Sequence, residues 1–142
     1  MALRSLIYRH IVKTGFAPTR AEIIQIVGHE ADAQLRRLHD AHMIVLDQRP
    51  HRLGEIRMAL PFAAESTNFR VSTESGAWWA NCAWDALAVV AAVQENARID
   101  STWSDTDQPF LLDISDGVLV PAIGYIHFRI AARHWWDDIV RT

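Results

Sequence analysis

The sequence contains very little cysteine, and it lacks the long apolar runs of a membrane protein. Cys82 is the single cysteine among 142 residues, which excludes an intramolecular disulfide and any metal site built from several cysteines. Hydrophobic residues make up 50% of the chain, but no unbroken run approaches the ~20 residues of a bilayer-spanning helix. The N-terminus has no signal-peptide pattern. We therefore expect a soluble, cytoplasmic protein with its own core and no membrane partner.

The two halves of the chain differ in charge. Residues 1–60 contain nine Lys or Arg against six Asp or Glu, whereas residues 61–142 contain five against eleven. All six tryptophans follow position 77, and five of the seven histidines precede position 52. Such an uneven distribution predicts two subdomains with different roles. We place them at residues 1–62 and 63–142.

The N-terminal half has the spacing and the capping signals of three helices followed by a hairpin. Leu3, Ile7 and Ile11 share one helix face, and Thr19 forms a capping box with Glu22 at the start of the next helix. The expected elements are helices over 3–15, 19–28 and 31–42, and strands over 43–46 and 55–60 around a turn at 49–54. This order predicts a winged-helix-like subdomain, whose third helix enters the major groove when the fold binds DNA.

Nucleic acid is an alternative partner that the charge pattern favours only weakly. The surplus of basic over acidic residues in 1–60 is three, and phosphate contacts supply most of the non-specific affinity of DNA-binding proteins. Arg36 and Arg37 are adjacent, so they diverge on a helix and form no basic stripe. A structural or substrate-covering role for residues 1–62 is the competing interpretation.

The sequence of the C-terminal half predicts an antiparallel sheet packed on one buried helix. Its alanine-rich stretch over 80–93 is apolar nearly all round, which is typical of a buried helix. Strands are expected over 68–71, 97–104, 109–114, 118–120 and 124–131, with a short helix beginning near His134. The predicted fold class is therefore α+β, and the six tryptophans are expected to fill the core.

The chemistry is concentrated around Cys82 and Asp85, which lie three residues apart and so share one side of the expected helix. The N-terminus of a helix lowers the pKa of a thiol, whereas a neighbouring carboxylate acts in the opposite sense. Apolar surroundings keep a carboxyl protonated. Such a pair can cleave a bond and protonate the leaving group. The alternative is that Cys82 is a small buried hydrophobic residue.

The run from Trp79 to Leu87 contains the pattern Cys-Ala-x-Asp-x-Leu and resembles the active-site helix of the alkylmercury (organomercurial) lyase family. The segments 68–71, 125–128 and 135–139 are similar to that family too. The resemblance implies that the Cys82 thiolate attacks the mercury of an organomercurial substrate and that Asp85 delivers a proton to the departing carbon. Mercury is a soft metal that prefers thiolate to oxygen or nitrogen ligands.

The chain departs from the family pattern at the second cysteine. Family members carry it just before a histidine-containing strand, but the matching residues 121–127 contain no thiol. Either an external small thiol is the second mercury ligand, or the substrate carries a related soft element, or catalysis is lost. We also hypothesise that a cysteine or selenocysteine follows Thr142.

Other residues around the motif are candidates for substrate binding, namely Trp79, Asn81, Trp84 and His127. His127 either lines the pocket, on the expected strand around it, or is structural. Motifs for nucleotide binding, zinc proteases and serine hydrolases do not occur, so no cofactor is expected. A non-catalytic protein that binds or senses a soft metal or an electrophile, with a DNA-binding subdomain, is the alternative function.

Overall fold

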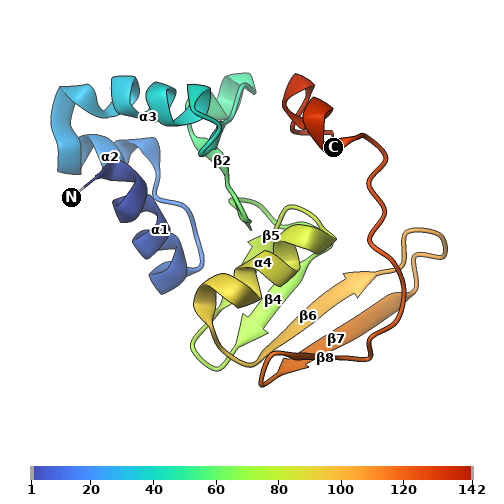
Figure 1. The fold of residues 1–142 in the computed structure, drawn as a ribbon. Coiled ribbons are helices and arrows are strands. Elements are labelled where there is room, and N and C mark those ends of the chain that lie inside the picture. Colours follow the sequence, from blue (N-terminus) through green and yellow to red (C-terminus); the bar gives the residue numbers. More distant parts are fainter. Residues whose placement is uncertain (1, 142) are drawn as a thin grey trace.

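The computed structural model describes residues 2–141 and begins with three helices (Figure 1). These are α1 (Leu3–Thr14), α2 (Arg20–Val27) and α3 (Ala31–Asp40), with a 3-10 turn, η1 (Gly28–Glu30), before α3. The capping box is confirmed, because the Glu22 amide donates to Thr19 Oγ1 at 3.2 Å while the Thr19 amide donates to Glu22 Oε2 at 2.7 Å. The three helices therefore lie where the sequence predicts them.

One sheet of eight strands follows, and it extends through both halves of the chain. The strands are β1 (Val45–Leu46), β2 (Ile56–Ala59), β3 (Phe62–Ala63), β4 (Arg70–Thr73), β5 (Ala77–Ala80), β6 (Ala97–Thr102), β7 (Pro109–Ser115) and β8 (Val118–Val120). Their order is β1-β2-β3-β5-β4-β6-β7-β8, and neighbouring strands are antiparallel. The α+β class is confirmed.

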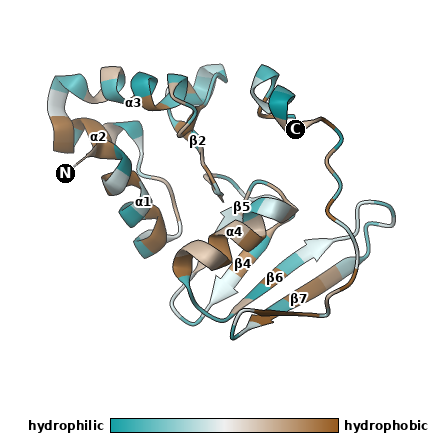
Figure 2. Cartoon of the chain, viewed as in Figure 1, coloured by the Kyte–Doolittle hydropathy of each residue, from teal (hydrophilic) through white to brown (hydrophobic). Residues whose placement is uncertain are grey.

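Helix α4 (Ala83–Val93) connects β5 to β6 and packs on β4 and β5 (Figure 1). The core face of the sheet is set by strand register, which places Val71 beside Trp78 on one side and beside Ile99 on the other. All three are buried in the same cluster as Ala86 and Val89 of α4. Apolar residues run along α4 and β7 in Figure 2. This packing holds the start of α4 against the end of β5.

Helix α4 differs from the prediction in its start and in its burial. Residues 80–82 are not helical, since β5 ends at Ala80 and the helix begins only after Cys82. The helix is also not buried all round, because Trp84 is 57% exposed and Ala91 is exposed as well. A helix lying on one face of a sheet buries only the side chains that point toward the sheet. Exposing the small side chain of alanine on the opposite side of the helix costs little free energy.

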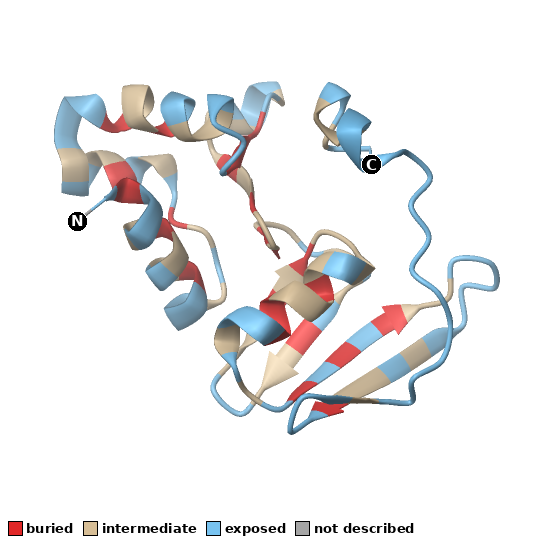
Figure 3. Ribbon diagram, in the orientation of Figure 1, coloured by how far each residue is buried: buried red, intermediate tan, exposed pale blue. Residues whose placement is uncertain are grey.

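The predicted strand over 124–131 is wrong: within the described residues, 121–131 form an irregular, exposed segment (Figure 3). Pairing ends at Val120 because Pro121 has no backbone N–H to donate. The segment runs back toward α3 and leads to a 3-10 helix, η3 (Ala132–Asp137) (Figure 1). The indole of Trp136 stacks there on the imidazole of His42, with the ring centroids 3.8 Å apart. The prediction that the tryptophans fill the core is wrong for all but Trp78, which alone among the six is buried.

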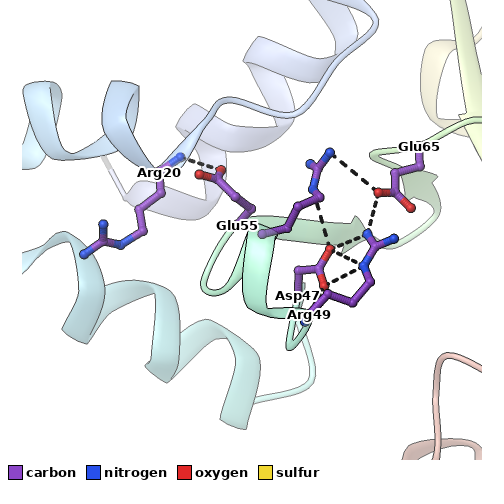
Figure 4. A network of polar contacts seen from close by, with 6 residues as sticks. Arg20, Asp47, Arg49, Glu55 and Glu65 are labelled. Carbon is purple, nitrogen blue, oxygen red and sulfur yellow. Dashed lines mark hydrogen bonds and ion pairs between the residues drawn. The ribbon is translucent and has the colours of Figure 1, made fainter.

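A polar network fixes the loop between β1 and β2, which contains the 3-10 helix η2 (Pro50–Arg52). Asp47 is fully buried, and its carboxylate accepts from the Arg49 amide and from Arg49 Nε, both at 2.9 Å (Figure 4). The Arg49 guanidinium also contacts Glu65 in the loop after β3. These bonds hold the pKa of Asp47 at about 2, below the ordinary value of 3.8, because the Arg49 side chain stabilises the anion.

Within residues 2–141, no helix has both the length and the apolar character needed to cross a membrane.

Candidate active site

The candidate site lies at the junction of β5 and α4. Cys82 occupies the N-cap position with an extended backbone (φ −152°, ψ −179°), and its Sγ accepts a hydrogen bond from the Asp85 amide at 3.5 Å. The sulfur therefore takes the place that a serine or aspartate oxygen has in an ordinary N-cap. The expected proximity of Cys82 and Asp85 is confirmed, although it arises from capping and not from a shared face of one helix.

The carboxyl group of Asp85 lies in the first turn of α4 and is largely covered. Its Oδ2 accepts a hydrogen bond from Asn81 Nδ2 at 3.0 Å. Burial raises the pKa of Asp85 above the ordinary 3.8, and the hydrogen bonds from Asn81 and from the Cys82 thiol oppose that rise. The expectation that apolar surroundings favour the protonated form of Asp85 therefore agrees with the geometry.

The sequence indicates two opposing effects on the Cys82 thiol, because the helix N-terminus is expected to lower its pKa and the neighbouring carboxylate to raise it. Burial raises the pKa of Cys82 above the ordinary 9.0, and the hydrogen bond from the Asp85 amide offsets only part of this. The Asp85 carboxylate adds to the rise through charge repulsion. Desolvation therefore outweighs the effect of the helix N-terminus at this sulfur. Cys82 therefore rests as a thiol that a soft metal can deprotonate on binding.

Tyr8 of α1, which the sequence analysis did not single out, lies near this site. The hydroxyl of Tyr8 donates to the Leu60 carbonyl at 2.7 Å, and the negative charge of Asp85 contributes to the raised pKa of Tyr8, whose main cause is burial. The Arg4 guanidinium lies 5.6 Å from the centre of the Tyr8 ring. The spacing of four residues places Arg4 and Tyr8 on one helix face, but nothing in the sequence indicates that this face meets the β5–α4 junction.

The other predicted site residues are dispersed. Trp79 follows the buried Trp78 on β5, so strand alternation directs it to the opposite sheet face, where its ring lies 5.6 Å from the Arg70 guanidinium. Trp84 projects from the first turn of α4 into solvent. His127 is exposed in the irregular segment 121–131. Of the four candidates, only Asn81 hydrogen-bonds to Asp85.

The described residues contain no group of three or more histidine, cysteine, aspartate or glutamate side chains arranged to hold a metal ion. The described residues at the junction of β5 and α4 bring together one thiol and one protonatable carboxyl group. A thiol can bind a soft metal, and an acid beside it can supply a proton.

Residues 62–142 match the family model described as alkylmercury lyase, and both Cys82 and Asp85 lie inside the matched region. The match covers more than half of the sequence, and the chain belongs to the alkylmercury lyase family. No curated protein sequence gives a significant match.

The fold is similar to the crystal structure of the mercury-bound form of MerB2, with a TM-score of 0.61 and 21% sequence identity. The similarity covers 83% of this chain but only 56% of the MerB2 chain, so this chain spans little more than half of the length of that protein. At this identity the comparison establishes the shared fold.

Proposed function

We propose that this protein cleaves the carbon–mercury bond of organomercurial compounds, with Cys82 as the mercury-binding thiolate and Asp85 as the proton donor. The observation that carries the proposal is the hydrogen bond from the Asp85 amide to Cys82 Sγ at 3.5 Å. This contact supports the proposal because the Cys82 sulfur and the largely covered carboxyl group of Asp85 lie at the start of the same helix, inside the region that matches the family. Family membership supports the choice of mercury as the soft element.

The reaction begins when the sulfur of Cys82 bonds to the mercury of R–Hg–X and X departs with the thiol proton as HX. The Asp85 carboxyl then gives its proton to the carbon while the electron pair of the carbon–mercury bond moves to that carbon. The hydrocarbon R–H leaves, mercury stays on the Cys82 sulfur, and Asp85 becomes a carboxylate. The raised pKa of Asp85, which is caused by burial, favours the protonated form that this step requires.

External thiols complete the cycle in this proposal. Cys82 is the single cysteine of the sequence, so one external small thiol supplies the other sulfur ligand to mercury before the bond is cleaved, and the proton that it loses returns to Asp85 after cleavage. A further thiol then takes mercury from Cys82 as the dithiolate and gives its own proton to the Cys82 sulfur. Two sulfur ligands weaken the carbon–mercury bond more than one, which makes cleavage depend on the added thiol. Binding of mercury alone needs only Cys82.

We also propose that residues 1–62 form a winged-helix-like subdomain that covers the site. The support is the position of α1, whose Tyr8 hydroxyl is bonded to the Leu60 carbonyl near the charge of Asp85. The exposed Trp84 then offers an apolar surface at the open side of the site for the organic group of the substrate.

The test is release of benzene from a phenylmercury salt by the purified protein, with and without an excess of a small thiol. We expect turnover with the thiol, no turnover by Cys82→Ala, and slow turnover but unchanged mercury binding by Asp85→Asn. Asp113→Asn is the matched control, because Asp113 is paired with Arg98 on the solvent-facing side of the sheet. Absence of benzene from the wild-type protein with thiol present contradicts the proposal.

A further inference from the structure

Asn81 connects two separate parts of the chain through one side-chain amide. Its Nδ2 donates to the Pro61 carbonyl at 3.1 Å and to Asp85 Oδ2 at 3.0 Å. A backbone carbonyl can only accept, so the nitrogen and not the oxygen of the amide must face Pro61. Both N–H groups of Asn81 are thereby used, one on the loop between β2 and β3 and the other on the carboxyl group of Asp85.

We infer that Asn81 is a positioning residue that holds the Asp85 carboxyl group with Oδ2 toward the Asn81 amide, so that Oδ1 is the oxygen available for proton transfer. In a protonated carboxyl group the carbonyl oxygen accepts more strongly than the hydroxyl oxygen, so the N–H donor at Oδ2 favours the proton on Oδ1. This inference rests on the proposed function for the destination of that proton, which is the carbon bonded to mercury.

The same bond has a second effect on Asp85. A donor at Oδ2 stabilises the carboxylate that remains after proton transfer, so it opposes the burial that favours the neutral acid. The loop that anchors Asn81 is itself held from the other side, because the Leu60 carbonyl accepts from the Tyr8 hydroxyl at 2.7 Å. Asn81 is thus bonded to a loop that is itself held in place, and the Asn81 amide in turn holds the carboxyl group of Asp85.

The first test is the variant Asn81→Leu, which keeps the size of the side chain and removes both donors. We expect the pKa of Asp85, followed by carbon-13 NMR of its carboxyl group, to rise above that of the wild-type protein. The pH profile of benzene release should move to higher pH, while mercury binding by Cys82 stays unchanged. Asn68→Leu, the same replacement in the exposed loop before β4, should move neither quantity. An unchanged Asp85 pKa in Asn81→Leu overturns the inference.

A second measurement needs no change at Asn81 and covers the case in which Asn81→Leu fails to fold. The side-chain amide signals of Asn81 in the wild-type protein should follow the titration of Asp85, and they should lose that pH dependence in Asp85→Asn. Chemical shifts of the Asn81 side-chain amide that stay constant while Asp85 titrates overturn the inference. Neither NMR result depends on turnover, so a protein that releases no benzene but passes both tests contradicts only the proposed function.

Discussion

The indole Nε1 of Trp78 on β5 donates a hydrogen bond to the carbonyl of Ile11 on α1 at 2.9 Å. The same carbonyl accepts from the Gly15 amide at 2.8 Å, so it also closes the last turn of the helix. Trp78 lies four residues before Cys82, and its side chain is 2% exposed. The end of α1 and the strand that leads into the candidate site are therefore held by one buried contact.

Replacing Trp78 should destabilise the protein more than replacing any other tryptophan. Trp78→Ala removes a buried indole from the core and leaves a cavity, which lowers the free energy of unfolding by about 3–5 kcal/mol. Trp84→Ala is the matched control, because this side chain is 57% exposed and its loss should cost less than about 1 kcal/mol. Chemical denaturation of the two variants measures the difference. Equal losses would contradict the assignment of Trp78 to the core.

Gly15 should tolerate substitution less well than another glycine of similar backbone conformation. Gly15 (φ +82°) has the Ala77 carbonyl 2.8 Å from the place of a Cβ atom, whereas Gly117 (φ +76°) has nothing within 4 Å. Gly117→Ala should cost about 1–2 kcal/mol from the left-handed backbone alone. Gly15→Ala carries that cost and must also push α1 away from β5. Thermal unfolding tests this, and similar melting temperatures for the two variants would refute the close approach.

The local structure of the N-terminal half was predictable because its signals lie within a few residues of one another. The capping box of Thr19 and Glu22 starts α2, and the spacing of Leu3, Ile7 and Ile11 defines the buried face of α1. The strand order was not predictable in the same way. The pairing of β3 with β5 and of β4 with β6 depends on contacts between distant segments, which no local pattern encodes.

The motif of the site was visible in the sequence, but its surroundings were not. Cys82 and Asp85 stand out by residue type and spacing, whereas the contact of Asn81 with Pro61 joins two loops that only the folded chain brings together. The sequence left the net direction of the Cys82 pKa shift open for a related reason. The spacing reveals the helix N-terminus that lowers a thiol pKa, but it does not reveal how far burial removes water from the sulfur.

The buried carboxylate of Asp47 should make the protein sensitive to acid. Its pKa of about 2 lies below the ordinary 3.8, so its stabilising contribution is present above pH 3.8 and is lost as the pH falls through about 2. Asp47→Asn should lower the free energy of unfolding at neutral pH by about 2 kcal/mol, because charged hydrogen bonds are lost in a buried place. The difference in free energy of unfolding between the wild-type protein and Asp47→Asn should disappear in acid.

Asp113→Asn is the control for Asp47, since it breaks the exposed pair with Arg98 and should cost less than about 1 kcal/mol. Urea denaturation over a series of pH values measures both variants. A gap between wild type and Asp47→Asn that does not change with pH would show that the charge of Asp47 has no role in stability.

Asp85 should have the opposite effect on stability. Its pKa is raised by burial, so its contribution is fully present below the unfolded value near 3.8 and is lost as the pH rises through the folded value. Asp85→Asn has a neutral side chain at every pH. The variant should therefore gain stability relative to wild type as the pH rises from acid to neutral, as measured by melting temperature. A relative loss over that range would mean that the Asp85 carboxylate is stabilised in the folded protein.

The Cys82 thiol should react more readily when the charge of Asp85 is removed. In the wild-type protein, burial raises the pKa of Cys82, and the neighbouring carboxylate raises it further by repelling the thiolate and by accepting the S–H. Alkylation by iodoacetamide follows the thiolate, so its rate should rise only at alkaline pH. Asp85→Asn should move this rise to lower pH, whereas Asp113→Asn should leave it in place. A shift to higher pH in Asp85→Asn would mean that the carboxyl group stabilises the thiolate, which would contradict the charge repulsion between the two groups.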